Sequence, residues 1–138
     1  MGTALRPDGR CVAAVWGDRR HCGWAEIFPI VDARVQSDVC PMFFQLGTGD
    51  ALALTMSQAG LAGIEAQRIS VRLRYATADD ALGAAFAGGP VALAYARFDE
   101  ETRLAAHEEY LASIAPFRSG DGYDIPGEFV GASGKRPA

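Results

Sequence analysis

The feature that most constrains the fold is a turn that leads directly into an apolar strand near the N-terminus. Pro7 cannot continue a helix, and Asp8 and Gly9 are typical turn residues. Residues 11–16 (CVAAVW) are apolar without alternation, which is typical of a strand covered on both faces in a parallel or mixed α/β sheet. We therefore expect a central strand almost at the start of the chain.

The remaining pattern predicts two further strands and three or four helices. Alternating side chains predict a half-buried strand near 64–75, and a second apolar run predicts a closing strand near 125–132. Helical spacing and capping residues predict helices from about 28, from a cap at Thr48 or Asp50 to about Gln58, from 77 to Gly88-Gly89-Pro90, and from about 99 to 115. The last of these has Leu104, His107, Leu111 and Ile114 on its apolar side. We expect one α/β domain spanning 1–138, with a small mixed three-stranded sheet and helices.

Composition excludes several classes of protein. The net charge of −4 argues against a nucleic-acid-binding surface, and no apolar run reaches the roughly 18 residues that a membrane span needs. The N-terminus does not have the pattern of a signal peptide. Cys11, Cys22 and Cys40 form no Cys-x-x-Cys pair, so neither a zinc site nor a disulfide framework is indicated. We expect a reduced, cytoplasmic chain.

Several segments, in order, resemble the C-terminal half of class I S-adenosylmethionine-dependent methyltransferases of the methyltransferase type 11 kind. Residues 5–10 (LRPDGR) resemble the Leu-Arg-Pro-Gly-Gly-Arg turn before the fifth strand of that family, with Asp8 at the first glycine. The series continues with WAEIFP at 24–29, AGL at 59–61, APFRSGDGY at 115–123 and IPGE at 125–128. The resemblance implies a partial Rossmann-like fold.

The same resemblance implies methyl transfer from S-adenosylmethionine to a small-molecule acceptor. In relatives the end of this first strand and the next helix help to wall the acceptor pocket, which makes Trp16, Trp24, Phe28 and Phe44 the candidate pocket residues; a purely structural role for all four is the alternative. The acidic-x-Gly-x-Gly loop and the acidic residue that hold the cofactor in relatives do not occur in residues 1–138. We therefore expect this chain not to bind S-adenosylmethionine tightly by itself, and we assign no catalytic residue.

Other polar residues have a functional and a structural interpretation. The loop 18–23 follows the first strand at the edge where open α/β sheets bind ligands. His21 beside Cys22 resembles a nucleophile pair, but sequence neighbours usually point apart, so surface polarity is favoured. His107 fits a hydrogen-bonded boundary histidine better than a base.

Two further patterns are ambiguous in the same way. Residues 47–50 (GTGD) resemble a nucleotide loop but lack its third glycine and its later acidic residue, which favours a plain turn. Arg68, Arg72 and Arg74 share one strand face and predict either an acidic ligand site or a solvated sheet face.

These observations leave three functional hypotheses. The first is a methyltransferase-related chain that carries the substrate-side half and is not catalytically competent alone. The second is a noncatalytic small-molecule-binding or oligomerisation module, and the third is a subunit whose partner contributes the missing half. In the family the fifth strand lies between the fourth and the seventh, so without a fourth strand residues 11–16 would form an exposed apolar edge. We expect a homo-oligomer, or pairing with another chain, through this edge.

Overall fold

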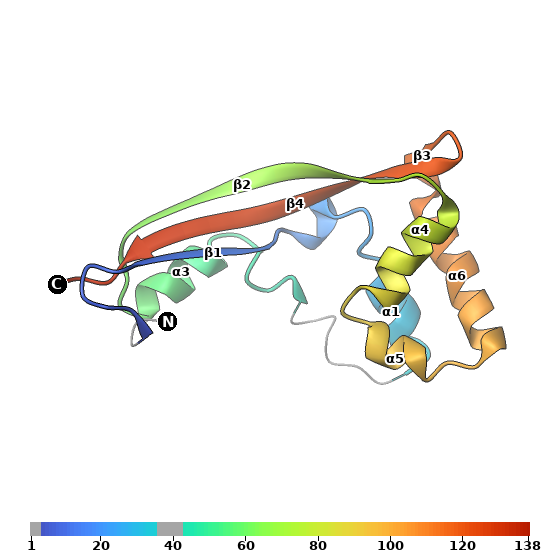
Figure 1. Cartoon of the computed structure of the whole chain (residues 1–138), viewed down its shortest axis with the longest axis horizontal. Coiled ribbons are helices and arrows are strands. Elements are labelled where there is room, and N and C mark those ends of the chain that lie inside the picture. The colour runs from blue at the N-terminus through green and yellow to red at the C-terminus, as the bar shows by residue number, and fades with distance from the viewer. Residues whose placement is uncertain (1–3, 36–42) are drawn as a thin grey trace.

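The computed structural model describes residues 4–35 and 43–138 and has an α/β architecture built on one long sheet (Figure 1). The strands are β1 (Arg10–Trp16), β2 (Ala62–Tyr75) and β4 (Gly122–Lys135), in the order β1-β4-β2. A two-residue strand, β3 (Arg118–Ser119), pairs with the start of β4. Cys40 and the connector around it lie outside the described residues.

The three predicted long strands are therefore present, but the sheet is not mixed. β4 pairs antiparallel with β1 on one side and with β2 on the other, so that Trp16 and Ile69 both lie opposite Phe129. Because β1 and β2 are separated by β4, neither has a parallel neighbour among the described strands. β1 consequently lies at an edge of the sheet and not at its centre.

Helices occupy the two ends of the sheet. α3 (Ala51–Gln58) packs at the end where both termini lie (Figure 1). The other end carries α1 (Ile27–Asp32), α4 (Ala78–Leu82), the π-helical turn η3 (Gly83–Ala87), α5 (Ala92–Ala96) and α6 (Glu100–Ile114). Short 3-10 turns, η2 (Arg19–His21) and η4 (Ala115–Phe117), follow β1 and α6.

Side-chain caps explain where two of these helices begin. The Thr77 side chain accepts a hydrogen bond from the backbone N–H of Asp80, 3.1 Å away, at the start of α4. Asp99 accepts from the N–H of Thr102 at 2.8 Å in the same way before α6. Both caps satisfy N–H groups that the first helical turn leaves without partners.

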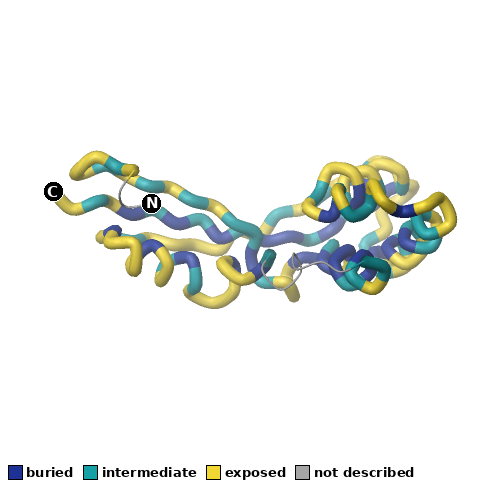
Figure 2. The backbone as a smooth tube through the Cα atoms, turned by 90° about the horizontal axis from the view of Figure 1, so that it is seen from below, coloured by how far each residue is buried: buried dark blue, intermediate teal, exposed yellow. Residues whose placement is uncertain are grey.

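Two hydrophobic clusters use opposite faces of β4. Ile125 and Tyr123 belong to the large cluster with α1, α4 and α6, whereas Val130 and Ala132 belong to a smaller cluster with α3. Side chains along a strand alternate between faces, so these odd and even positions point to opposite sides. Figure 2 shows the result as two helical lobes joined by the strands.

The prediction that residues 11–16 are covered on both faces is wrong. Cys11, Ala13 and Val15 pack against the α3 cluster, but Val12, on the other face, is 75% exposed. Ile69 of β2, in line with the same face, is 42% exposed. No helix among residues 4–35 and 43–138 covers the part of this face that carries Val12 and Ile69. These apolar side chains are therefore exposed to solvent.

The apolar face predicted for the last helix is also rotated. α6 buries Ala106, Tyr110 and Ile114, which recur every fourth residue, and leaves Leu104 58% exposed. Ile114 and the partly buried Leu111 were placed correctly, but Tyr110 at the centre of the buried face was missed.

Candidate functional site

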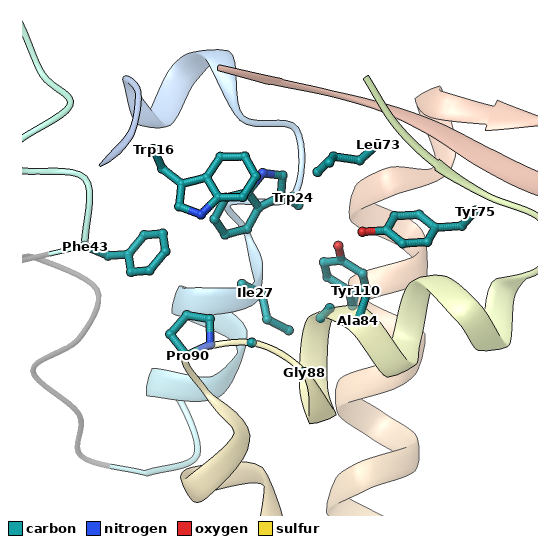
Figure 3. A pocket seen from close by; sticks show the side chains of 12 residues that line it. Trp16, Trp24, Ile27, Phe43, Leu73, Tyr75, Ala84, Gly88, Pro90 and Tyr110 are labelled. Carbon is teal, nitrogen blue, oxygen red and sulfur yellow. The ribbon is translucent and has the colours of Figure 1, made fainter. Parts of the chain in front are cut away.

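A cavity of about 230 Å³ lies between the sheet and the helical lobe that contains α1, η3 and α6. We call it the aromatic cavity. The sheet contributes Trp16, Leu73 and Tyr75, at the C-terminal ends of β1 and β2. Trp24 and Phe43 form a second wall, and Tyr110 of α6 closes the far side (Figure 3). The cavity is therefore bounded by five aromatic rings.

Strand alternation places the sheet residues of this wall together. Leu73 and Tyr75 are two positions apart on β2, and Trp16 aligns with the same face through Phe129. Trp16 stacks on Phe129 with ring centroids 4.3 Å apart. Gly127 lies beneath the indole: a Cβ added there would be 3.3 Å from Cζ3 of Trp16. The missing side chain lets the Trp16 ring lie against the strand.

Small residues keep the helical wall open. Ala84 and Ala85 of η3, with Gly88 and Gly89 after it, line the cavity and project at most one carbon into it. η3 is a π-helical turn, a rare conformation that is often found at functional sites. The Gly-Gly-Pro interruption predicted from the sequence is thus part of the cavity wall.

The structure brings two of the four candidate pocket residues to the cavity. Trp16 and Trp24 line it and contact one another edge to face, with centroids 4.8 Å apart. Phe28 and Phe44 are buried behind the wall, where their ring centroids lie 6.0 and 5.6 Å from that of Trp24. These two phenylalanines hold Trp24 in place and do not face the cavity.

Sequence reasoning missed Tyr75 and Tyr110. Tyr75 ends the predicted β2 alternation, so the strand pattern carried a signal for it. No sequence pattern indicated Tyr110, because the predicted buried face of this helix included Leu111 and not Tyr110. Figure 3 shows both hydroxyl oxygens directed toward one another at the edge of the cavity.

The described part of the cavity wall carries no charged side chain. Its polar side-chain groups are the hydroxyls of Tyr75 and Tyr110 and the indole N–H groups of Trp16 and Trp24. Burial raises the pKa of both tyrosines, and that of Tyr110 is raised further by Tyr75 nearby. The indole N–H of Trp24 is buried without a hydrogen-bond partner among the described residues. The cavity is thus uncharged at neutral pH and presents O–H groups.

The loop after β1 is organised by a buried carboxylate, Glu128 of β4. Its Oε1 accepts from the backbone N–H of Asp18 at 3.0 Å and from Arg68 Nη1 at 2.6 Å, and its Oε2 lies 3.1 Å from His21 Nδ1. Glu128 is only 7% exposed. Burial raises the pKa of this carboxyl, but the hydrogen bonds from Asp18, His21 and Arg68 outweigh burial and hold the pKa below its usual value.

Cys22 does not have the properties of a nucleophile. The side chain is buried, and its thiol lies 4.0 Å from the backbone carbonyl oxygen of Glu128. Burial raises the pKa of the thiol, which disfavours the reactive thiolate.

The three arginines of β2 are engaged by groups of this chain. Arg68 bonds Glu128 and also the carbonyl oxygen of Gly49, at 2.8 Å. Nε of Arg72 lies 3.0 Å from Asp124 Oδ1, and Nε of Arg74 lies 3.8 Å from the same atom. These contacts favour the interpretation that the arginines lie on a solvated sheet face over the interpretation that they bind an acidic ligand.

His107 accepts or donates one hydrogen bond, to the Tyr95 hydroxyl at 2.8 Å. Burial lowers the pKa of its imidazole. It is therefore the hydrogen-bonded boundary histidine that the sequence favoured.

The aromatic cavity does not fit S-adenosylmethionine. The cavity wall offers no carboxylate for the ribose hydroxyls. In the 47–50 segment, a Cβ on Gly47 would fall on the carbonyl oxygen of Trp16, so that glycine is required for packing within the chain and not for a ligand. Gly49 has φ +55°, as in a turn. We therefore derive no chemical step through this cofactor.

Within residues 4–35 and 43–138, no group of three or more His, Cys, Asp or Glu side chains is arranged to hold a metal ion. No helix in the same residues is long and apolar enough to cross a membrane.

Comparison with known proteins gives structural likenesses only. No protein-family model matches the chain, and no curated protein matches it. The chain is similar to the crystal structure of a "putative methyltransferase" from Bacillus halodurans C-125, with 11% sequence identity and a TM-score of 0.45. The match covers 97% of this chain and 58% of that protein, so this chain spans little more than half of its length.

Proposed function

We propose that this chain is the substrate-side half of a class I methyltransferase-like protein and that the aromatic cavity holds the methyl acceptor. The observation that carries the proposal is the cavity walled by Trp16 and Trp24 at the end of β1. This is where the sequence resemblance puts the acceptor pocket.

Strand order supports the same proposal. In the family that the sequence resembles, the fifth strand lies beside the seventh, and here β1 pairs with the last strand, β4, over all seven of its residues. The segment before β1 that carries the sequence resemblance forms a turn, in which the N–H of Gly9 donates to the carbonyl oxygen of Arg6 at 2.8 Å. In this proposal the cofactor cradle is supplied by residues other than those described.

Tryptophan fluorescence tests the proposal because both tryptophans of the chain line the cavity. Small neutral aromatic compounds should quench the emission saturably. S-adenosylmethionine, which is charged and larger, should not. Absence of saturable quenching by any ring compound up to millimolar concentration would contradict the proposal, and so would low-micromolar binding of S-adenosylmethionine to the isolated chain.

A specific observation favours a second candidate, an oligomerisation role through β1. Val12 and Ile69 present apolar side chains on the uncovered end of the sheet, and no described strand pairs with the outer edge of β1. Exposed apolar strands at a sheet edge favour association with another chain. The two roles are compatible, because Val12 lies near the start of β1 and Trp16 lines the cavity at its end.

A further inference from the structure

The hydroxyl groups of Tyr75 and Tyr110 reach the aromatic cavity and are not used by the fold itself. Both side chains line the cavity, and neither hydroxyl has a hydrogen-bond partner among the described residues. Neither oxygen is among the buried polar atoms that lack a partner, so both are open to the cavity. Figure 3 shows the two oxygens directed toward one another. Water or a ligand in the cavity can therefore complete their hydrogen bonds.

Both hydroxyls are donors at physiological pH. Burial raises the pKa of each phenol, so each keeps its proton well above neutrality. Even if one hydroxyl donates to the other, one O–H proton remains for a third group. A hydrogen-bond acceptor inside the cavity provides a partner for that proton.

The rest of the wall excludes anionic ligands. No lysine or arginine lines the described wall, so a carboxylate would find no counter-ion. Transfer of an unpaired anion into such a site is unfavourable. A neutral oxygen remains as the partner for the tyrosine hydroxyls.

Volume and shape restrict the ligand further. The cavity of about 230 Å³ exceeds the roughly 150 Å³ of an apolar cavity that holds benzene, and is smaller than the roughly 300 Å³ at which pockets for drug-sized ligands begin. The rings of Trp16, Trp24 and Phe43 favour stacking or edge contacts with a planar partner. One ring, or two fused rings, fit this space.

We propose that the ligand of the aromatic cavity is a neutral ring compound whose hydroxyl or carbonyl oxygen binds between the Tyr75 and Tyr110 hydroxyls. This inference rests on the proposed function only in that the same cavity holds a ligand. It adds the class of that ligand and names the two residues that select it.

The test compares p-cresol with p-xylene, which has the same shape but a methyl group in place of the hydroxyl. Binding is followed by NMR through the two indole N–H signals, since both tryptophans line the cavity. We expect p-cresol to bind about fivefold more tightly than p-xylene, the ratio expected of one net hydrogen bond. We expect 4-methylbenzoate, which is charged at neutral pH, to bind at least about tenfold more weakly than p-cresol.

Variants assign the selectivity to the two tyrosines. Tyr75→Phe and Tyr110→Phe remove the hydroxyls but keep the rings, so p-xylene should bind as before while the preference for p-cresol falls toward one. Tyr95→Phe is the matched control, because its hydroxyl bonds His107 outside the aromatic cavity. It should leave the preference unchanged.

The outcomes separate this inference from the proposed function. If neither ring compound binds, the cavity is not a ligand site and both fail. If p-xylene and p-cresol bind equally to the wild-type chain, the cavity stands and only the oxygen site is wrong; this comparison needs no variant to fold. A preference for p-cresol that survives both tyrosine substitutions would also overturn the inference.

Discussion

At the scale of single residues, Glu128 determines how the end of β1 is held. Its carboxylate joins the backbone at Asp18, the His21 ring and the Arg68 guanidinium, which in turn bonds Gly49. One buried side chain thus connects β4, β2, the loop after β1 and the turn before α3. This connection positions Trp16, which is two residues before Asp18.

Replacing Glu128 by glutamine tests this role. The substitution keeps the shape but removes the charge, so we expect a loss of about 1–3 kcal/mol in the free energy of unfolding at pH 7. The folded-state pKa of Glu128 is below its usual value, so its stabilisation is present above the usual value of 4.5 and is lost as the pH falls through the folded-state pKa. The difference between Glu128→Gln and wild type should therefore shrink toward pH 3.

Urea denaturation at pH 7 and pH 3 measures both effects. Glu26→Gln is the control, because Glu26 is exposed and its only described ion pair, with Arg19, is 3.7 Å long. Surface pairs of this kind contribute little, so its effect should stay within about 0.5 kcal/mol. A Glu128→Gln variant as stable as wild type at pH 7 would show that the carboxylate does not hold the loop.

Residue types alone predicted two of the side chains that line the aromatic cavity. Trp16 and Trp24 could be selected because large rings next to a polar loop at a strand end are unusual in a solvated segment. Phe28 and Phe44 could not be separated from them, since a buried supporting ring and a lining ring have the same sequence signature. The role of Glu128 could not be predicted from the sequence, because its three partners come together only when β4 lies between β1 and β2.

At the scale of elements, turns and caps were the most predictable features and helix faces the least. Thr77, Asp99 and Pro7 act through their immediate neighbours, so the sequence is sufficient to place them. The buried face of α6 depends on contacts with α1 and α4, which are distant in the sequence. A choice between two adjacent apolar stripes cannot be made from the helix alone.

Two alanine substitutions in α6 test the observed face. Ile114 is fully buried, so Ile114→Ala should cost about 2–5 kcal/mol of unfolding free energy. Leu104→Ala removes a similar side chain that is 58% exposed and should cost less than about 1 kcal/mol. Thermal or urea unfolding of both variants is sufficient. Equal losses in the two variants would mean that the helix buries the face predicted from the sequence.

At the scale of the whole molecule, the sheet leaves one apolar surface uncovered. The apolar, non-alternating sequence of β1 predicted that both faces of the strand are buried. The described residues bury only one of them. The sequence of β1 alone could not show that one face is exposed, because burial of a strand face depends on which helices pack against it. Val12 and Ile69 therefore remain exposed.

Self-association through this surface is the expected consequence. At micromolar concentration, light scattering should give a mass above that of a single chain. Val12→Lys should reduce this mass and leave stability nearly unchanged, because the side chain is 75% exposed. Leu93→Lys is the control, since Leu93 is as exposed but lies in α5, far from β1. A wild-type chain that is monomeric and folds cooperatively would contradict this account of β1.

The most direct test of the central claim is to locate a bound ring compound by intermolecular NOEs. With p-cresol, the account predicts contacts from the ligand ring to Trp16, Trp24 and Tyr110, around the aromatic cavity. A second, more open hollow lies beside Tyr95 and His107 and provides the alternative site on the same molecule. Contacts confined to Tyr95 and His107, with none to either tryptophan, would contradict the claim that the cavity at the end of β1 is the ligand site.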